Sequence, residues 1–206
     1  NPDYSQLVMP VNVPYAYNLY SFVYFSTPLR PLGINIKIRS HEMWKRGINI
    51  INEEENINTN TTHSLKISLE NRNKKKWGVN LGGAMSLTNS KFSIAESMNN
   101  VYYNTSYFAD ARYTPGSKWN FKIEGNVVNY NSKSFTESIS IPILNASITY
   151  YFLKGEKASL SVRGYDLLNR SLHISQVTDG NFLVREESNM IGQYIMLLFK
   201  IKIGKQ

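Results

Sequence analysis

Apolar and polar residues alternate along most of this chain with a period of two. Residues 119–127 keep the alternation throughout except at Gly125. Residues 34–39 and 65–70 follow the same rule, with Ile or Leu at every second position. Successive side chains of a β-strand point to opposite faces, whereas a helix would spread these apolar residues around its axis. The pattern therefore predicts strands with one apolar and one polar face.

Turn signals divide the strands into a regular order. Short signals occur at residues 28–33, 71–75, 115–118 and 154–157, about forty residues apart. Longer polar connections are predicted at residues 52–62, 89–100, 131–136 and 168–188. Short turns on one rim and long loops on the other are typical of outer-membrane β-barrels. A soluble sandwich would show turn signals about every 8–12 residues, without this alternation of lengths.

The distribution of apolar residues along the chain favours a β-barrel over a membrane-spanning helix. Apolar residues make up 42% of the sequence, yet no run approaches the ~18 residues of a membrane-spanning helix. Inside a bilayer only helices and closed barrels satisfy every backbone group. We therefore predict an all-β fold, an antiparallel transmembrane β-barrel of about nine meander strands.

The predicted strand count is odd. One span precedes residue 28, two lie between each pair of short turns, and a pair ends the chain. Bacterial single-chain barrels normally have an even number of strands. We therefore expect residues 1–206 to be one barrel segment, the closing part of a larger barrel. We expect the signal peptide and the plug domain to be absent from this segment.

Aromatic residues, 13% of the chain, cluster near the predicted strand ends. A ring with an apolar body and a polar tip favours the lipid headgroup zone, although aromatic residues also suit soluble sheets. We predict a membrane-interface girdle of Tyr15, Tyr17, Tyr20, Tyr102, Tyr103, Tyr107, Tyr150, Tyr151 and Phe152.

The polar strand faces supply the candidate functional residues. In a barrel a Lys or Arg on the lipid face costs about 2–4 kcal/mol at the bilayer midplane, so these side chains should face the lumen. Most should solvate the inner wall or pair with a plug domain, and a minority should contact a transported solute. The candidates are Lys37, Arg39, Lys66, Glu70, Asn80, Asp110, Arg112, Lys122, Glu124, Asn126, Arg163 and Lys200.

The last forty residues carry a more specific pattern. A strand closes on Gly164-Tyr165-Asp166-Leu167-Leu168-Asn169, and a loop and an apolar strand over residues 189–201 follow. This order resembles the end of the TonB-dependent receptor barrels of Bacteroidetes, and residues 118–153 and, more loosely, the chain back to about Tyr15 fit the same family. The residues named here match its aromatic-Asp-Leu-Leu/Phe-Asn motif.

The resemblance implies a ~22-stranded, plugged barrel in the outer membrane of a Gram-negative bacterium. Such receptors import scarce nutrients with energy from the inner membrane. The implied partners are outer-membrane lipid, the remainder of the barrel, the plug domain and a TonB-type energy-coupling protein, with a surface lipoprotein as a further candidate.

Other kinds of function find little support. The net charge of +8 is not accompanied by a nucleic-acid recognition motif, so we expect no nucleic-acid partner. His41, His63 and His173 lie far apart and there is no cysteine, so no metal site is assigned and no cofactor is expected. A hydrolase active site could be assembled from His173 with Ser171 or Ser175, but no sequence motif singles out these residues. We expect no enzyme.

Two alternatives remain open. A complete small barrel, acting as an anchor or adhesin, would pair the span near residues 19–25 with the span near residues 195–203. A soluble β-rich binding protein would bury Trp119, Phe121, Ile123 and Leu197 in a protein core.

Overall fold

Nine strands form one antiparallel sheet in the computed structural model. The structure describes residues 10, 12–94, 96–132, 139–153, 155–170, 172–179, 182–189 and 191–203, with backbone only at Met98, Ser132, 172–179 and 182–189. The sheet runs in the order β1 (Tyr17–Leu29), β2 (Ile34–Ile51), β3 (Glu54–Asn71), β4 (Trp77–Phe92), β5 (Asn100–Tyr113), β6 (Trp119–Ser132), β7 (Ile139–Phe152), β8 (Ala158–Tyr165) and β11 (Tyr194–Ile201).

The remaining elements are small. Strands β9 (Leu172–Asp179) and β10 (Phe182–Asn189) form a separate two-stranded sheet. Two 3-10 turns, η1 (Arg30–Leu32) and η2 (Glu96–Met98), lie in connections. No helix among the described residues is long and apolar enough to cross a membrane.

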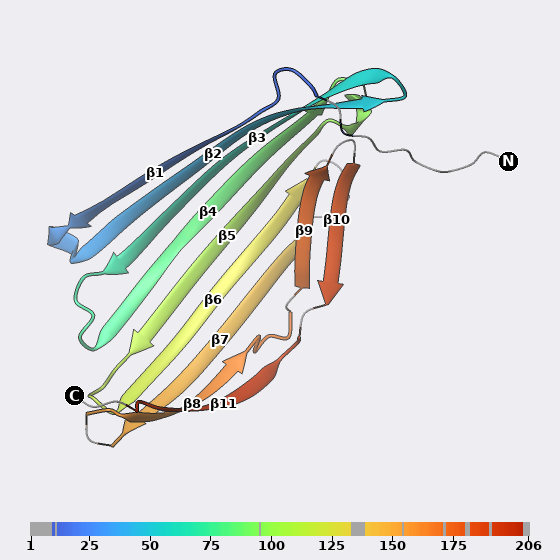
Figure 1. Cartoon of the computed structure of the whole chain (residues 1–206). Coiled ribbons are helices and arrows are strands. Elements are labelled where there is room, and N and C mark those ends of the chain that lie inside the picture. Colours follow the sequence, from blue (N-terminus) through green and yellow to red (C-terminus); the bar gives the residue numbers. More distant parts are fainter. Residues whose placement is uncertain are drawn as a thin grey trace.

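The sheet curls into an open trough (Figure 1). Each neighbouring pair is antiparallel and in continuous register, which confirms the predicted meander of about nine strands. The sheet does not close, because β1 pairs with β2 and β11 with β8, and no pairing joins β1 to β11 among the described residues. The two edge strands therefore lie far apart in the strand order.

The predicted short turns are present at one end of the sheet. At the first, Gly33 takes the left-handed conformation (φ 63°) that ends η1. At the second, the Asn71 side chain holds both ends of the turn. Its Nδ2 donates to the Trp77 carbonyl at 2.8 Å and its Oδ1 accepts from the Val79 N–H at 2.7 Å. This double contact explains why the chain reverses there.

The predicted loop at residues 52–62 is wrong. Strands β2 and β3 continue to Ile51 and Glu54, joined by Asn52 and Glu53 with φ of 50° and 70°. Positive φ at both central residues is the geometry of a type I′ hairpin turn. The polar residues that suggested a loop belong to the strand, where Asn58 Oδ1 accepts from the Gly47 N–H at 3.1 Å.

The other long connections differ in part from the loops that the sequence predicted. The connection at 89–100 is shorter than predicted, because β4 runs to Phe92 and β5 begins at Asn100. The paired strands β9 and β10 occupy most of the predicted loop at 168–188, and β10 ends one residue beyond it. Most of the predicted loop at 131–136 lies outside the described residues.

Candidate functional site

The strand register sorts the side chains onto two faces. Cross-strand partners share a face, and the partners Lys37–Ser68 and Arg39–Lys66 start the series on β2 and β3. Followed to β11, the register places every predicted lumen residue on this one side, the polar face. It carries Lys37, Arg39, Lys66, Glu70, Asn80, Asp110, Arg112, Lys122, Glu124, Asn126, Arg163 and Lys200.

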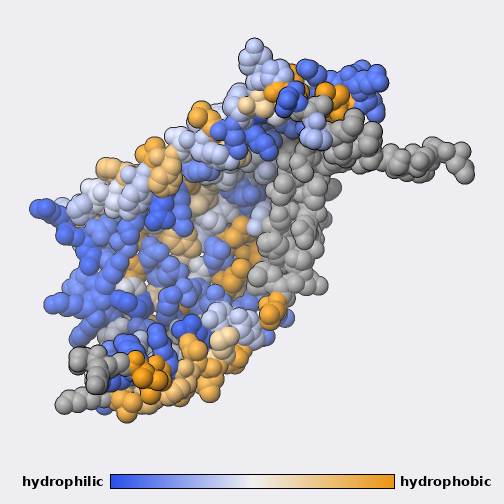
Figure 2. Space-filling view, in the orientation of Figure 1, coloured by the Kyte–Doolittle hydropathy of each residue, from blue (hydrophilic) through white to orange (hydrophobic). Residues whose placement is uncertain are grey.

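The polar face is the hollowed side of the sheet. Figure 2 shows hydrophilic residues filling the trough between the strands. That this surface lines a lumen stays a prediction, since the sheet alone does not enclose a channel.

Part of the charge on the polar face is neutralised locally. Glu70 accepts from Lys37 Nζ at 2.7 Å and from Lys74 Nζ at 2.8 Å. Lys122 Nζ lies 2.5 Å from Glu124 Oε1, two residues along the same strand. These pairs lie toward the short-turn end of the sheet, and they reduce the net positive charge there.

The opposite side, the apolar face, is exposed. It carries the alternate strand residues, including Trp119 (44% exposed), Ile123 (46%) and Leu197 (68%). The soluble alternative required these residues, with Phe121, in a protein core, and this prediction is wrong for the sheet as described. A continuous exposed apolar surface of this kind needs a membrane or another apolar partner.

A belt of aromatic rings crosses the apolar face near the short turns. Trp77 stacks on Tyr113 with ring centroids 4.1 Å apart, and Trp119 contacts Tyr150 at 4.7 Å. Further ring contacts extend the row from β4 to β11. We call this set the aromatic belt: Trp77, Tyr113, Trp119, Phe121, Tyr150, Phe152 and Phe199.

Sequence reasoning missed most of the aromatic belt. It grouped adjacent tyrosines, although neighbouring strand residues point to opposite faces. The missing signal was an aromatic residue at an apolar-face position next to a short turn, as at Trp77 and Trp119.

The predicted girdle residues divide between the faces. The register places Tyr20, Tyr102 and Tyr151 on the polar face, and Tyr15 precedes β1 with a φ of 59°. The girdle proposal therefore keeps the members on the apolar face: Tyr17, Tyr103, Tyr107, Tyr150 and Phe152.

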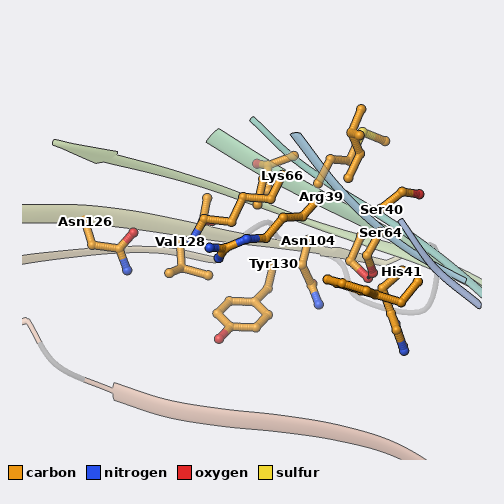
Figure 3. Close-up of a pocket in the computed structure, with 16 residues that line it drawn as sticks. Arg39, Ser40, His41, Ser64, Lys66, Asn104, Asn126, Val128 and Tyr130 are labelled. Atoms are coloured by element: carbon orange, nitrogen blue, oxygen red, sulfur yellow. Dashed lines mark hydrogen bonds between the residues drawn. The ribbon is translucent and has the colours of Figure 1, made fainter. Parts of the chain in front are cut away.

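The polar face contains a hollow of about 500 Å³ (Figure 3). Arg39 and Lys66 lie beside it, and each approaches an aromatic ring. The Arg39 Cζ lies 5.4 Å from the Tyr24 ring centroid, and the Lys66 Nζ lies 4.5 Å from the Phe108 ring centroid. Such cation–π contacts hold the charged groups over the wall of the trough.

The Asp-Leu-Leu-Asn segment forms the corner after β8. Asp166 and Asn169 have positive φ (45° and 52°). Asp166 Oδ1 accepts from the Arg170 N–H at 3.1 Å, and Asn169 Oδ1 accepts from the Gln193 N–H at 3.1 Å. Both residues therefore stabilise the turn that follows β8. The second contact joins the corner to the chain entering β11.

No cluster of three or more His, Asp or Glu side chains able to hold a metal lies within the described ranges. The side chain of His173 is not described.

Comparison with known proteins gives one finding. A family model described as "Outer membrane protein beta-barrel family" matches residues 11–200. No curated protein and no solved structure shows a significant match. The matched region covers nearly all of the sheet, including both of its edge strands. The chain therefore belongs to the outer membrane protein beta-barrel family, which places it in the outer membrane.

Proposed function

We propose that the chain forms the closing part of the barrel wall of a TonB-dependent receptor-like nutrient importer. The host is a Gram-negative bacterium, and the C-terminal resemblance points to the Bacteroidetes. In this proposal the apolar face contacts outer-membrane lipid and the polar face lines a plugged lumen. The segment has a structural and permeation role and performs no catalytic step.

The open sheet is the observation that carries the proposal. The outer edge of β1 and the outer edge of β11 have no strand partner among the described residues. Unpaired N–H and C=O groups are costly in hydrocarbon, so each edge needs a further strand. A larger barrel supplies both partners.

The dimensions of the apolar face suit an outer membrane. On β4 the apolar-face positions run from Trp77, in the aromatic belt, to Leu87. Ten residues of a strand tilted by about 40° cross about 25 Å, close to the apolar band of outer-membrane barrels. The parts of β2 and β3 beyond this level then project from the bilayer.

The proposed partners follow from the same arrangement. The remaining strands pair with β1 and β11, and a plug domain fills the trough against its charged side chains. A TonB-type protein reaches the receptor from the periplasm, and a surface lipoprotein is a further candidate partner at the opposite rim.

Cysteine cross-linking tests whether the sheet closes on itself. The chain has no cysteine, so pairs can be placed freely. Cysteine at Leu197 is combined in turn with cysteine at each odd position of β1 from Leu19 to Thr27, all of which share the apolar face. Leu197 with Val162, which are register partners, is the positive control. We expect oxidation to link only the control pair. A β1–β11 disulfide within one chain would contradict the larger barrel.

A binding measurement tests the importer itself. The full-length protein in detergent should bind the purified periplasmic domain of a TonB-type protein from the same bacterium. An unrelated porin is the control. Absence of binding would contradict energy-coupled import but leave the barrel architecture intact.

A further inference from the structure

Two positive charges face each other across β2 and β3 without a counter-charge. Arg39 and Lys66 are direct cross-strand partners, an arrangement that destabilises a sheet when both carry the same charge. In the described part of the chain neither forms an ion pair. Lys37, two residues before Arg39 on the same face, is paired with Glu70 at 2.7 Å. The described strands therefore supply no carboxylate that neutralises Arg39, and a bound anion could do so.

Aromatic rings position both cations while leaving their N–H donors available to an anion. The rings of Tyr24 and Phe108 support the Arg39 and Lys66 heads through cation–π contacts. A guanidinium has five N–H donors and an ammonium has three, and a ring face occupies none of them in a conventional hydrogen bond. Arg39 can present two parallel donors to a carboxylate or phosphate, and Lys66 adds a point charge.

The hollow beside these cations has the size of a small-molecule site. Its floor is formed by small side chains, so β3, β4 and β5 leave a depression between the longer residues of the rim. Its volume of about 500 Å³ falls within the ~300–1,000 Å³ of ligand pockets. The small residues of the floor are Ser64, Ala84, Ser86 and Ser106.

The far rim supplies further polar groups. Asn104, Asn126 and Tyr130 line the hollow from β5 and β6 (Figure 3). The amide and hydroxyl groups of these three residues can form hydrogen bonds with the polar body of a ligand. The hollow thus combines positive charge, a floor of small side chains and polar groups on the far rim.

We propose that Arg39 and Lys66 form an anion-binding site on the polar face. Its ligand is a small organic anion with a carboxylate or phosphate head and a hydroxyl-bearing body. The head binds Arg39 and Lys66, and the body lies over Ala84 and Val128 toward Asn104. The site needs only the wall formed by β2 to β6, so it does not depend on energy-coupled import.

Equilibrium dialysis on the full-length protein in detergent tests the proposal. The probes are 4-hydroxybenzoate for a carboxylate and 4-hydroxyphenyl phosphate for a phosphate, with 4-hydroxybenzyl alcohol as the uncharged counterpart. We expect at least one anion to bind at least tenfold more tightly than the alcohol at low salt. The anion that binds more tightly identifies the preferred head. Equal binding of the alcohol, or no binding of either anion, would overturn the proposal.

Variants locate the site on the wall. Arg39→Gln combined with Lys66→Gln should weaken anion binding at least tenfold. Lys122→Gln combined with Arg163→Gln removes the same charge from the same face outside the hollow, and it should change binding less than twofold. Arg39→Lys combined with Lys66→Arg keeps the charge and should retain most binding. An equal loss in both glutamine pairs would show a diffuse charge effect and contradict a defined site.

Discussion

At the scale of single residues, close approach between strands explains the placement of Gly82. A Cβ atom there would lie 2.2 Å from the Ile67 carbonyl oxygen and 2.7 Å from Phe108 Cζ. The Phe108 ring therefore rests on the wall where Gly82 leaves room, and it can reach Lys66. Period-two alternation predicts which face each of these residues occupies, but not that one position must be small.

Replacing Gly82 with alanine should destabilise the protein by about 1–3 kcal/mol, because the added methyl group overpacks the wall against backbone. The midpoint of guanidinium unfolding in lipid vesicles measures the loss. Gly116→Ala is the matched control, since its Cβ would meet nothing within 4 Å. Equal stability of the two variants would show that the Gly82 contact relaxes without cost.

Asp166 should contribute to stability at the corner after β8. It is 4% exposed, and its Oδ1 accepts from the Arg170 N–H. Asp166→Ala removes the acceptor and places alanine at positive φ, so we expect a loss of about 1–3 kcal/mol. Asp166→Asn keeps an acceptor and tolerates this φ, and it should lose much less. Thermal unfolding followed by circular dichroism distinguishes the two variants, and identical melting would contradict the capping role.

At the scale of strands, the alternation of apolar and polar residues predicted which face each side chain occupies. Local composition was a poorer guide to where the strands end. Every candidate lumen residue was assigned to one side from parity alone, and the register places all of them there. The hairpin at residues 52–53 was missed because Asn56, Asn58 and Asn60 were interpreted as loop residues. They are buried in β3, and burial is a tertiary effect that local composition does not contain.

A positive charge introduced at two adjacent positions of β3 should show which face of the sheet contacts lipid. Ile67→Arg puts a cation on the apolar face near its middle and should cost about 2–4 kcal/mol in lipid vesicles. Ser68→Arg puts the same charge on the polar face and should cost far less. Guanidinium unfolding of the vesicle-inserted protein gives both values. Equal costs would contradict the assignment of lipid to the apolar face.

At the scale of the whole molecule, the open trough is the property that the sequence predicted only indirectly. The odd number of spans suggested an incomplete barrel, and within the described residues the sheet has nine strands and no partner at either edge. The aromatic belt was not predicted as a unit, because it is assembled from residues on five strands. Only the register brings these rings into one row, and register depends on the pairing of distant segments.

The most direct test of the account is a cysteine scan along β6 in the full-length protein in lipid vesicles. Fluorescent labels at 121, 123 and 127 should be quenched by a lipid-phase quencher, and labels at 122, 124 and 126 by an aqueous one. This alternation is predicted because the first set lies on the apolar face and the second on the polar face. Equal aqueous quenching at all six positions would contradict a membrane-spanning wall.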